Sequence, residues 1–150
     1  MPHSYGVDPG SAGLLPWRRV AERLSASRNY WIVTGSQDRV HAAPVWGLWT
    51  KGKFYFSTDP ESRKGRNLAD NPNVVVHLES GDDVTIVEGL AERVPPESAD
   101  MPRLAETYER KYRIRVDFSN PSYALYKVNP RSALAWEEKD FPQNATRWRF

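Results

Sequence analysis

The stretch Phe54-Tyr-Phe-Ser-Thr-Asp-Pro-Glu-Ser-Arg-Lys64 contains the change of pattern that decides the fold. Its first half is rich in aromatic residues and is typical of a β-strand, which Asp59-Pro60 ends. Its second half predicts the first turn of a helix, with adjacent cations at positions 63 and 64. Phosphate groups bind where positive side chains, a hydroxyl and the free N–H groups of a helix N-terminus meet. The stretch therefore predicts an anion site between a strand and a helix.

The two hydroxyl residues of this stretch cannot play the same part. Ser57 and Thr58 are neighbours on the strand, so their side chains point to opposite faces. One of them is expected to donate its hydroxyl to an anion held by Arg63 and Lys64, and the other at most its N–H group. The alternative is a solvated basic helix start beside two incidental hydroxyls.

Strand patterns dominate the rest of the chain. They cover residues 30–34, 40–49, 54–58, 74–78, 84–94, 123–128 and 133–136. Helical patterns cover residues 16–27, 62–69 and 97–113. Pro44 interrupts the long 40–49 pattern, which predicts an edge, a bulge or a ligand contact there. Roughly five to seven antiparallel strands with a few short helices predict a mainly β fold, a small antiparallel barrel with helical additions.

Length and composition limit the classes of protein that fit. The chain has 150 residues, no cysteine and a net charge of +2. Disulfides and thiolate metal sites are therefore excluded, and the charge does not favour a nucleic-acid or membrane-surface binder. No apolar run approaches the ~20 residues that span a bilayer. We expect a flexible arm over residues 1–13, one domain over residues 14–150 and a cytoplasmic location.

Three segments in order resemble one protein family. The pattern Ser-Thr-x-x-x-Ser-Arg-Lys, continued by Asn67-Leu68 and Asn71-Pro72, resembles the pyridoxamine 5′-phosphate oxidase-like flavin and deazaflavin oxidoreductases. The run Val84-Thr-Ile-Val-Glu-Gly-Leu-Ala-Glu-Arg-Val94 is similar to the long strand of that family. The preceding helix, strand, polar turn and His41-Ala-Ala-Pro-Val-Trp46 also fit it.

The resemblance implies a split β-barrel homodimer with two cofactor sites in clefts between the subunits. In this family, the positions of Ser57, Thr58, Arg63 and Lys64 hold the cofactor phosphate. The strand around Pro44, Val45 and Trp46 would line the ring system, largely through its backbone. The tail often supplies a tryptophan beside the ring, for which the candidates are Trp136 and Trp148. The cofactor would be FMN or the 5-deazaflavin coenzyme F-420, whose phosphate-binding patterns are alike.

The chain also departs from the enzymes that make pyridoxal phosphate. Those oxidases carry an arginine and apolar residues where this chain has Ala43-Pro44-Val45, and their terminal substrate-binding pattern is absent. We therefore expect a flavin- or deazaflavin-dependent oxidoreductase that does not form pyridoxal phosphate. Hydride would pass to or from a planar conjugated small molecule near Trp46 and Trp49. No catalytic side chain and no metal site are expected, because the cofactor would carry the chemistry.

Two other functions compete with this interpretation. The same barrel could hold haem or another tetrapyrrole without redox catalysis, and only His3, His41 and His77 could supply an axial ligand. Exposed aromatic and arginine side chains on a small barrel are also typical of proteins that bind single-stranded nucleic acid, although the small net charge argues against it. A dimer without any ligand is the remaining alternative.

Overall fold

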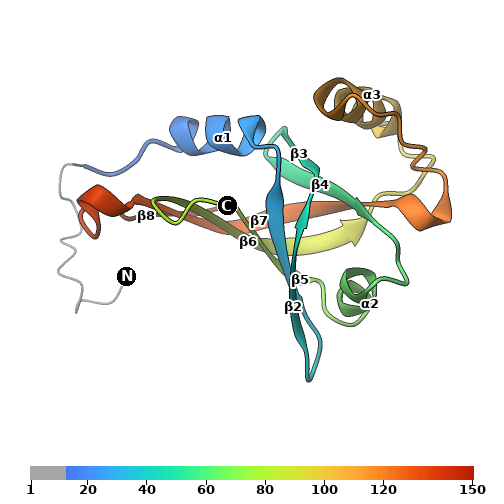
Figure 1. Ribbon diagram of the computed structural model, residues 1–150, viewed down its shortest axis with the longest axis horizontal. Helices are drawn as coiled ribbons and strands as arrows, with labels where there is room; N and C mark the ends of the chain where they lie inside the picture. The colour runs from blue at the N-terminus through green and yellow to red at the C-terminus, as the bar shows by residue number, and fades with distance from the viewer. Residues whose placement is uncertain (1–12) are drawn as a thin grey trace.

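The computed structural model describes residues 13–150, which form one mainly β structure (Figure 1). The expected flexible arm over residues 1–13 lies outside the described residues except for Gly13. The helices are α1 (Trp17–Ala26), α2 (Arg63–Asp70) and α3 (Met101–Tyr112), with short 3-10 turns η2 (Pro121–Tyr123) and η3 (Glu138–Asp140). The strands are β1 (Tyr30–Gly35), β2 (Val40–Val45), β3 (Gly47–Thr50), β4 (Lys53–Thr58), β5 (Asn73–His77), β6 (Asp83–Arg93), β7 (Ala124–Glu137) and β8 (Thr146–Arg149).

The strand order shows how the sheet closes. The strands pair antiparallel in the order β2-β1-β5-β6-β7-β4-β3, and β8 adds to β7. The first and last strands of this order, β2 and β3, follow one another in the chain and are separated only by Trp46. Because one residue joins its two ends, the sheet must curl round on itself. The mainly β barrel expected from the sequence is thereby confirmed.

The expectation of one long strand over residues 40–49 is wrong. The chain leaves β2, which pairs with β1, and at Trp46 enters β3, which pairs with β4. Pro44 lies on β2, an edge strand of the sheet, where the missing N–H group breaks no second ladder. The proline thus indicated the edge correctly but not the change of partner two residues later.

In the C-terminal half, by contrast, two expected strands are joined into one. The separate strands expected over residues 123–128 and 133–136 are one continuous strand, β7. Pro130 is tolerated inside it because β4 pairs with residues 124–128 and β8 with residues 132–135, which leaves the intervening edge open. Strand β8 was not expected at all. Helix α3 begins at Met101 rather than at residue 97, because turns closed by Pro95 O and Ser98 O precede it.

Two apolar clusters fill the structure. The larger lies inside the barrel around the fully buried rings of Tyr30, Phe54 and Phe56. The smaller one lies under α3, where Leu104, Tyr108 and Tyr112 contact Leu48 and Tyr55. Among the described residues, no helix is both long and apolar enough to cross a membrane.

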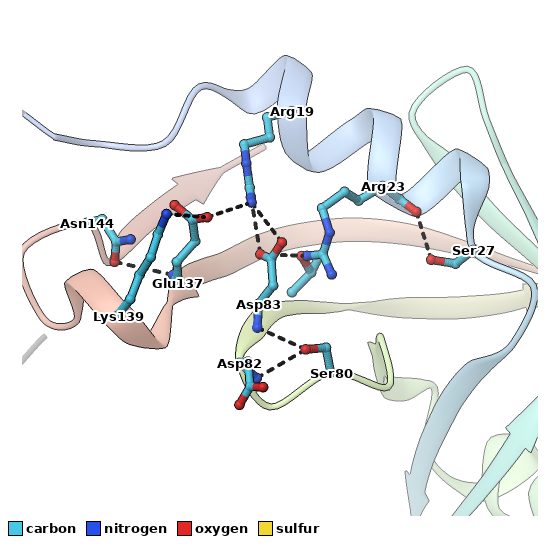
Figure 2. A network of polar contacts seen from close by, with 10 residues as sticks. Arg19, Arg23, Ser27, Ser80, Asp82, Asp83, Glu137, Lys139 and Asn144 are labelled. Carbon is cyan, nitrogen blue, oxygen red and sulfur yellow. Dashed lines mark hydrogen bonds and ion pairs between the residues drawn. The ribbon is translucent and has the colours of Figure 1, made fainter.

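A network of ionic contacts fixes α1 to the ends of β6 and β7 (Figure 2). The Arg19 guanidinium donates to both oxygens of Asp83 at 3.2 and 2.7 Å and to Glu137 at 3.1 Å. Arg23 lies 3.0 Å from Asp83 and also donates to Thr85. The hydrogen bond to Asp83 raises the pKa of Arg19 above its ordinary value. Helix α1 is therefore held by charge as well as by its buried face of Val20 and Leu24.

Candidate anion-binding site

The end of β4 and the start of α2 meet through their hydroxyl groups. The Thr58 and Ser62 hydroxyls hydrogen-bond to each other at 3.0 Å, and Ser62 Oγ also accepts from the Gly65 N–H at 3.2 Å. Each of the two hydroxyl groups carries one proton, and the hydrogen bond between them uses only one of these protons. The other proton can therefore be donated to a further acceptor. Ser57, on the opposite face of β4, takes no part in this contact.

Gly65 allows the turn between strand and helix to be this tight. A Cβ atom at this position would lie 2.4 Å from Pro60 O and 2.6 Å from Asp59 O. The Ser62 N–H donates back to Asp59 O at 2.9 Å, which closes the turn. The first turn of α2 is thus pressed against the loop that leaves β4.

Arg63 and Lys64 occupy the first two positions of α2. Neither side chain forms an ion pair or a hydrogen bond with any residue from 13 to 150. Neither neighbouring acid forms an ion pair with Arg63 or Lys64: one Asp59 oxygen accepts from the Glu61 N–H at 2.8 Å, and Glu61 pairs with Arg66 at 3.4 Å. Two unneutralised cations therefore lie at a helix N-terminus, whose free N–H groups add positive potential. The arrangement suits a dianion.

Asn67, in the middle of α2, anchors this helix to the barrel and was not among the candidate site residues from the sequence. Its side-chain amide donates to Thr34 Oγ1 at 3.1 Å, and the two residues are only 1% and 2% exposed. This bond ties α2 to β1 across the barrel end. The sequence signal was present, since Asn67 follows Arg63 by four residues and so shares its helix face.

The crossover between β2 and β3 passes beside the same strand end. Gly47, the first residue of β3, pairs with Phe56 of β4, so Trp46 and the end of β2 at Val45 come just before this pair while Ser57 and Thr58 follow it on β4. The Trp46 side chain turns toward α3, where it stacks on Tyr112 with ring centroids 4.6 Å apart. Trp49 instead packs edge-on against Trp17 of α1. The structure thus brings the backbone around Trp46 beside the strand end. It does not place the Trp46 and Trp49 side chains together, as a shared aromatic substrate pocket would need.

The C-terminal end of α3 holds Gly47 and was also missed from the sequence. Lys111 Nζ donates to Gly47 O at 2.9 Å and to the Tyr30 hydroxyl at 2.8 Å. Burial lowers the pKa of Lys111 to about 8, and burial raises the pKa of Tyr112 to about 12. The sequence placed Tyr112 only within the helical pattern over residues 97–113. A lysine within a helix gives no sequence signal of such a contact.

The two tail tryptophans lie far from the anion site of their own chain. Thr58 pairs with Ala124 at the start of β7, and Trp136 lies about 40 Å further along this strand at ~3.3 Å per residue. Trp148 on β8 pairs with Ala133 and packs against Trp17 at 5.2 Å. Figure 1 shows β8 and α2 at opposite ends of the sheet. Only from a second copy of the chain could either ring approach this site.

The outward face of the sheet carries an apolar band. One cross-strand row runs through Pro44, Trp31, His77, Ile86 and Leu134 on five successive strands. The next row begins with Ala42, Val33 and Val75 and continues to Glu88 and Ser132. Both rows end on β8, at Arg147 and Arg149. We call this surface the outer band.

Two histidines of the described chain were candidate haem ligands. His41 Nδ1 is buried without a hydrogen-bond partner in residues 13–150. The His77 ring lies parallel to Trp31 on the outer band, and its Nδ1 contacts Leu78 O at 2.8 Å. If Nδ1 carries the proton of that bond, Nε2 is left as an acceptor. Residues 13–150 contain no cluster of three His, Asp or Glu side chains that could hold a metal ion.

Comparison with known proteins adds a family and a fold. A sequence model described as pyridoxamine 5′-phosphate oxidase matches residues 17–137. General stress protein 26 from Bacillus anthracis str. Sterne is 23% identical, with a TM-score of 0.68 and coverage of 89% of this chain and 97% of that one. A FAD-binding protein from Mesorhizobium loti is 15% identical, with a TM-score of 0.62 and coverage of 79% and 92%. HutZ, the heme storage protein from Vibrio cholerae, is 13% identical, with a TM-score of 0.62 and coverage of 79% and 91%. No curated protein matches the chain.

Proposed function

Because the chain belongs to the pyridoxamine 5′-phosphate oxidase family, we propose that it is an oxidoreductase that uses FMN or a 5-deazaflavin coenzyme. The observation that carries this proposal is the unneutralised pair Arg63 and Lys64 beside the Thr58–Ser62 hydroxyl pair. Both cofactors end their ribityl chain in a phosphate, which these groups suit in charge and in donors. The FAD-binding structural neighbour supports a flavin in this fold.

Each element of the site has a separate task in this proposal. The first turn of α2 binds the phosphate through Arg63, Lys64 and their N–H groups, and Thr58 or Ser62 adds one hydroxyl donor. Ser57 contributes at most from the backbone. The crossover at Pro44, Val45 and Trp46 lines the ring. When bound, the cofactor supplies hydride transfer, while the protein orients the ring and excludes water from it.

The substrate of the proposed reaction is a planar conjugated small molecule. A hydride acceptor or donor must lie flat on the tricyclic ring, and a planar conjugated molecule stacks well on such a ring. Formation of pyridoxal phosphate is not proposed, because Ala43, Pro44 and Val45 provide no cation at the strand that carries one in those oxidases.

We further propose that the functional unit is a homodimer built on the outer band. The band carries the half-buried apolar side chains of Trp31, Val33 and Val75 on one continuous surface, which is typical of interfaces. Pairing with a second copy would also place a tail tryptophan, Trp136 or Trp148, beside the cofactor of the other subunit. Because both tryptophans lie far from the anion site of their own chain, the ring-side tryptophan of this proposal would have to come from the partner.

Titration with FMN tests the proposal. Replacing Lys64 with Ala removes a charge-assisted hydrogen bond and should weaken FMN binding by about 1.5–3 kcal/mol, measured by quenching of flavin fluorescence. Arg66→Ala is the matched control, because Arg66 lies on the same helix and already pairs with Glu61. It should leave FMN affinity nearly unchanged. Equal affinities of the Lys64→Ala protein and the unmodified protein would remove Lys64 from the site.

A haem-binding function is the second candidate, and the environment of His77 favours it. The His77 ring is held by Trp31 and by Leu78 O on an apolar surface, as an axial ligand would need. The heme storage protein among the structural neighbours has the same fold. Addition of haem should then give a Soret band that His77→Ala abolishes and His41→Ala retains. A protein that binds FMN and shows no Soret band would exclude this candidate.

A further inference from the structure

The end of α3 grips one peptide unit of the crossover. Tyr112 Oη accepts from the Gly47 N–H at 2.8 Å and lies 2.9 Å from Gly47 O. The same hydroxyl lies 2.8 Å from Arg28 O, so its proton can serve either carbonyl. Lys111 Nζ donates to Gly47 O from the other side at 2.9 Å. Two consecutive residues of one helix therefore satisfy both polar groups of Gly47.

On the other side, Gly47 lies so close to β4 that no side chain would fit at this position. A Cβ atom on Gly47 would lie 2.4 Å from the Phe54 ring and 2.7 Å from Tyr55 O. The peptide is thus enclosed between β4 on one side and α3 on the other. A shift of α3 would be transmitted directly to Gly47 and to the residue before it.

That preceding residue, Trp46, is held by the same helix. Its ring lies almost parallel to Tyr112, with an interplanar angle of 7° and centroids 4.6 Å apart. The Arg28 guanidinium lies 5.1 Å from the Trp46 ring centroid and 5.8 Å from that of Tyr112. Helix α3 therefore determines both the backbone and the side-chain direction of the crossover.

We propose that Lys111 and Tyr112 are positioning residues that fix the crossover at Val45–Gly47 for the ring of the bound cofactor. The inference rests on the proposed function, and neither residue would touch the cofactor. Packing alone does not require this arrangement, because an apolar side chain would fill the Lys111 position without desolvating an ammonium group. Two of its three N–H donors instead reach Gly47 O and the hydroxyl of Tyr30.

Substitution of the Tyr112 hydroxyl tests this role with little change in packing. Tyr112→Phe keeps the stack on Trp46 but removes the contacts to Gly47. Tyr108→Phe is the matched control, because Tyr108 is buried on the same helix and its hydroxyl hydrogen-bonds to no described residue. We expect Tyr112→Phe to weaken FMN binding on the order of 5- to 10-fold and Tyr108→Phe to leave it within about 2-fold.

Two further measurements separate positioning from a general loss of structure. The visible circular dichroism of bound FMN reports the ring environment, and it should change in Tyr112→Phe and in Lys111→Met but be restored in Lys111→Arg. The effects of Tyr112→Phe and Lys64→Ala on FMN affinity should add, because one acts on the ring and the other on the phosphate.

The outcomes distinguish this inference from the proposed function. Failure of the unmodified protein to bind FMN or the deazaflavin coenzyme overturns the proposed function. If the unmodified protein binds FMN while Tyr112→Phe and Tyr108→Phe have equal affinities and unchanged dichroism, the positioning role alone is overturned.

Discussion

Lys111 places an ammonium group between the rings of Tyr30 and Tyr112, 4.8 and 5.2 Å from their centroids. Burial lowers its pKa from the ordinary 10.5 to about 8. Between these values the unfolded chain binds the proton that the folded chain releases, so stability must rise with pH over that interval. The buried tyrosines act in the opposite direction at higher pH, since burial raises the pKa of Tyr30 and Tyr112 and the unfolded chain ionises first.

The expected result is a pH-dependent difference in stability between the unmodified protein and Lys111→Met. Urea unfolding measured from about pH 7 to about pH 10 should show the unmodified protein gaining stability relative to the variant as Lys111 loses its proton. Both proteins should lose stability above about pH 10, because both retain the buried tyrosines. A difference that stays constant over the whole range would contradict the assigned pKa.

Residues differ in how far the sequence indicates their part in the site. Thr58, Arg63 and Lys64 could be singled out because their spacing itself describes an anion site at a strand–helix junction. Lys111 and Tyr112 could not, because their partner Gly47 lies more than 60 positions away and no local pattern reports a contact of that range. The assignment of a cofactor to the site remains a prediction.

Helix α1 is attached to the barrel by a few charged groups whose loss can be measured. Asp83 receives Arg19 and Arg23, and its side chain is only 30% exposed. Replacing Asp83 with Asn keeps the shape but removes the charge, and should lower the free energy of unfolding by about 1–2 kcal/mol. Denaturant unfolding at low and high salt measures this loss, which salt should reduce.

The exposed pair of Arg18 and Glu22 on the same helix supplies the control. Their side chains are 90% and 65% exposed, so Glu22→Gln should change stability by no more than about 0.5 kcal/mol. Equal losses in Asp83→Asn and Glu22→Gln would show that the network in Figure 2 adds nothing beyond an ordinary surface pair.

Helices and strands that follow from the local residue pattern could be predicted from the sequence. Boundaries that depend on which strands pair with each other could not. The helix over α1, the hairpin around Gly52 and the strands β1 and β5 follow from residue type and turn chemistry. The division at Trp46 does not, because Pro44 indicates only an edge within the 40–49 pattern, and no local signal marks the change of pairing partner two residues later. In β7, the patterns over residues 123–128 and 133–136 predicted two separate strands, whereas the open edge between the β4 and β8 pairings lets one strand continue through Pro130.

At the scale of the whole molecule, the outer band predicts self-association. Val33 lies on β1 between Ala42 and Val75 in the apolar part of the band, so Val33→Arg should place a charge in the proposed interface and convert a dimer to a monomer in sedimentation experiments. FMN affinity should fall at the same time, because the partner's tail tryptophan is lost from the site. Thermal unfolding of the variant checks that the barrel itself is intact.

An exposed apolar residue outside the band provides the comparison for this experiment. Ile114 is 49% exposed beyond the end of α3, and Ile114→Arg should leave the oligomeric state unchanged. An unmodified protein that sediments as a monomer at micromolar concentration would contradict the proposed dimer.

The two end strands of the sheet, β2 and β3, are joined by the single residue Trp46, so the length of this connection cannot change without moving one of the strands. An insertion at Trp46 would disrupt the pairing of β3 with β4, and a deletion would disrupt the pairing of β2 with β1. A change in ligand preference must therefore leave the length of this connection unaltered. Selection or engineering would have to act through substitutions on the neighbouring elements, such as α2, β8 or the C-terminal end of α3, which contacts Gly47.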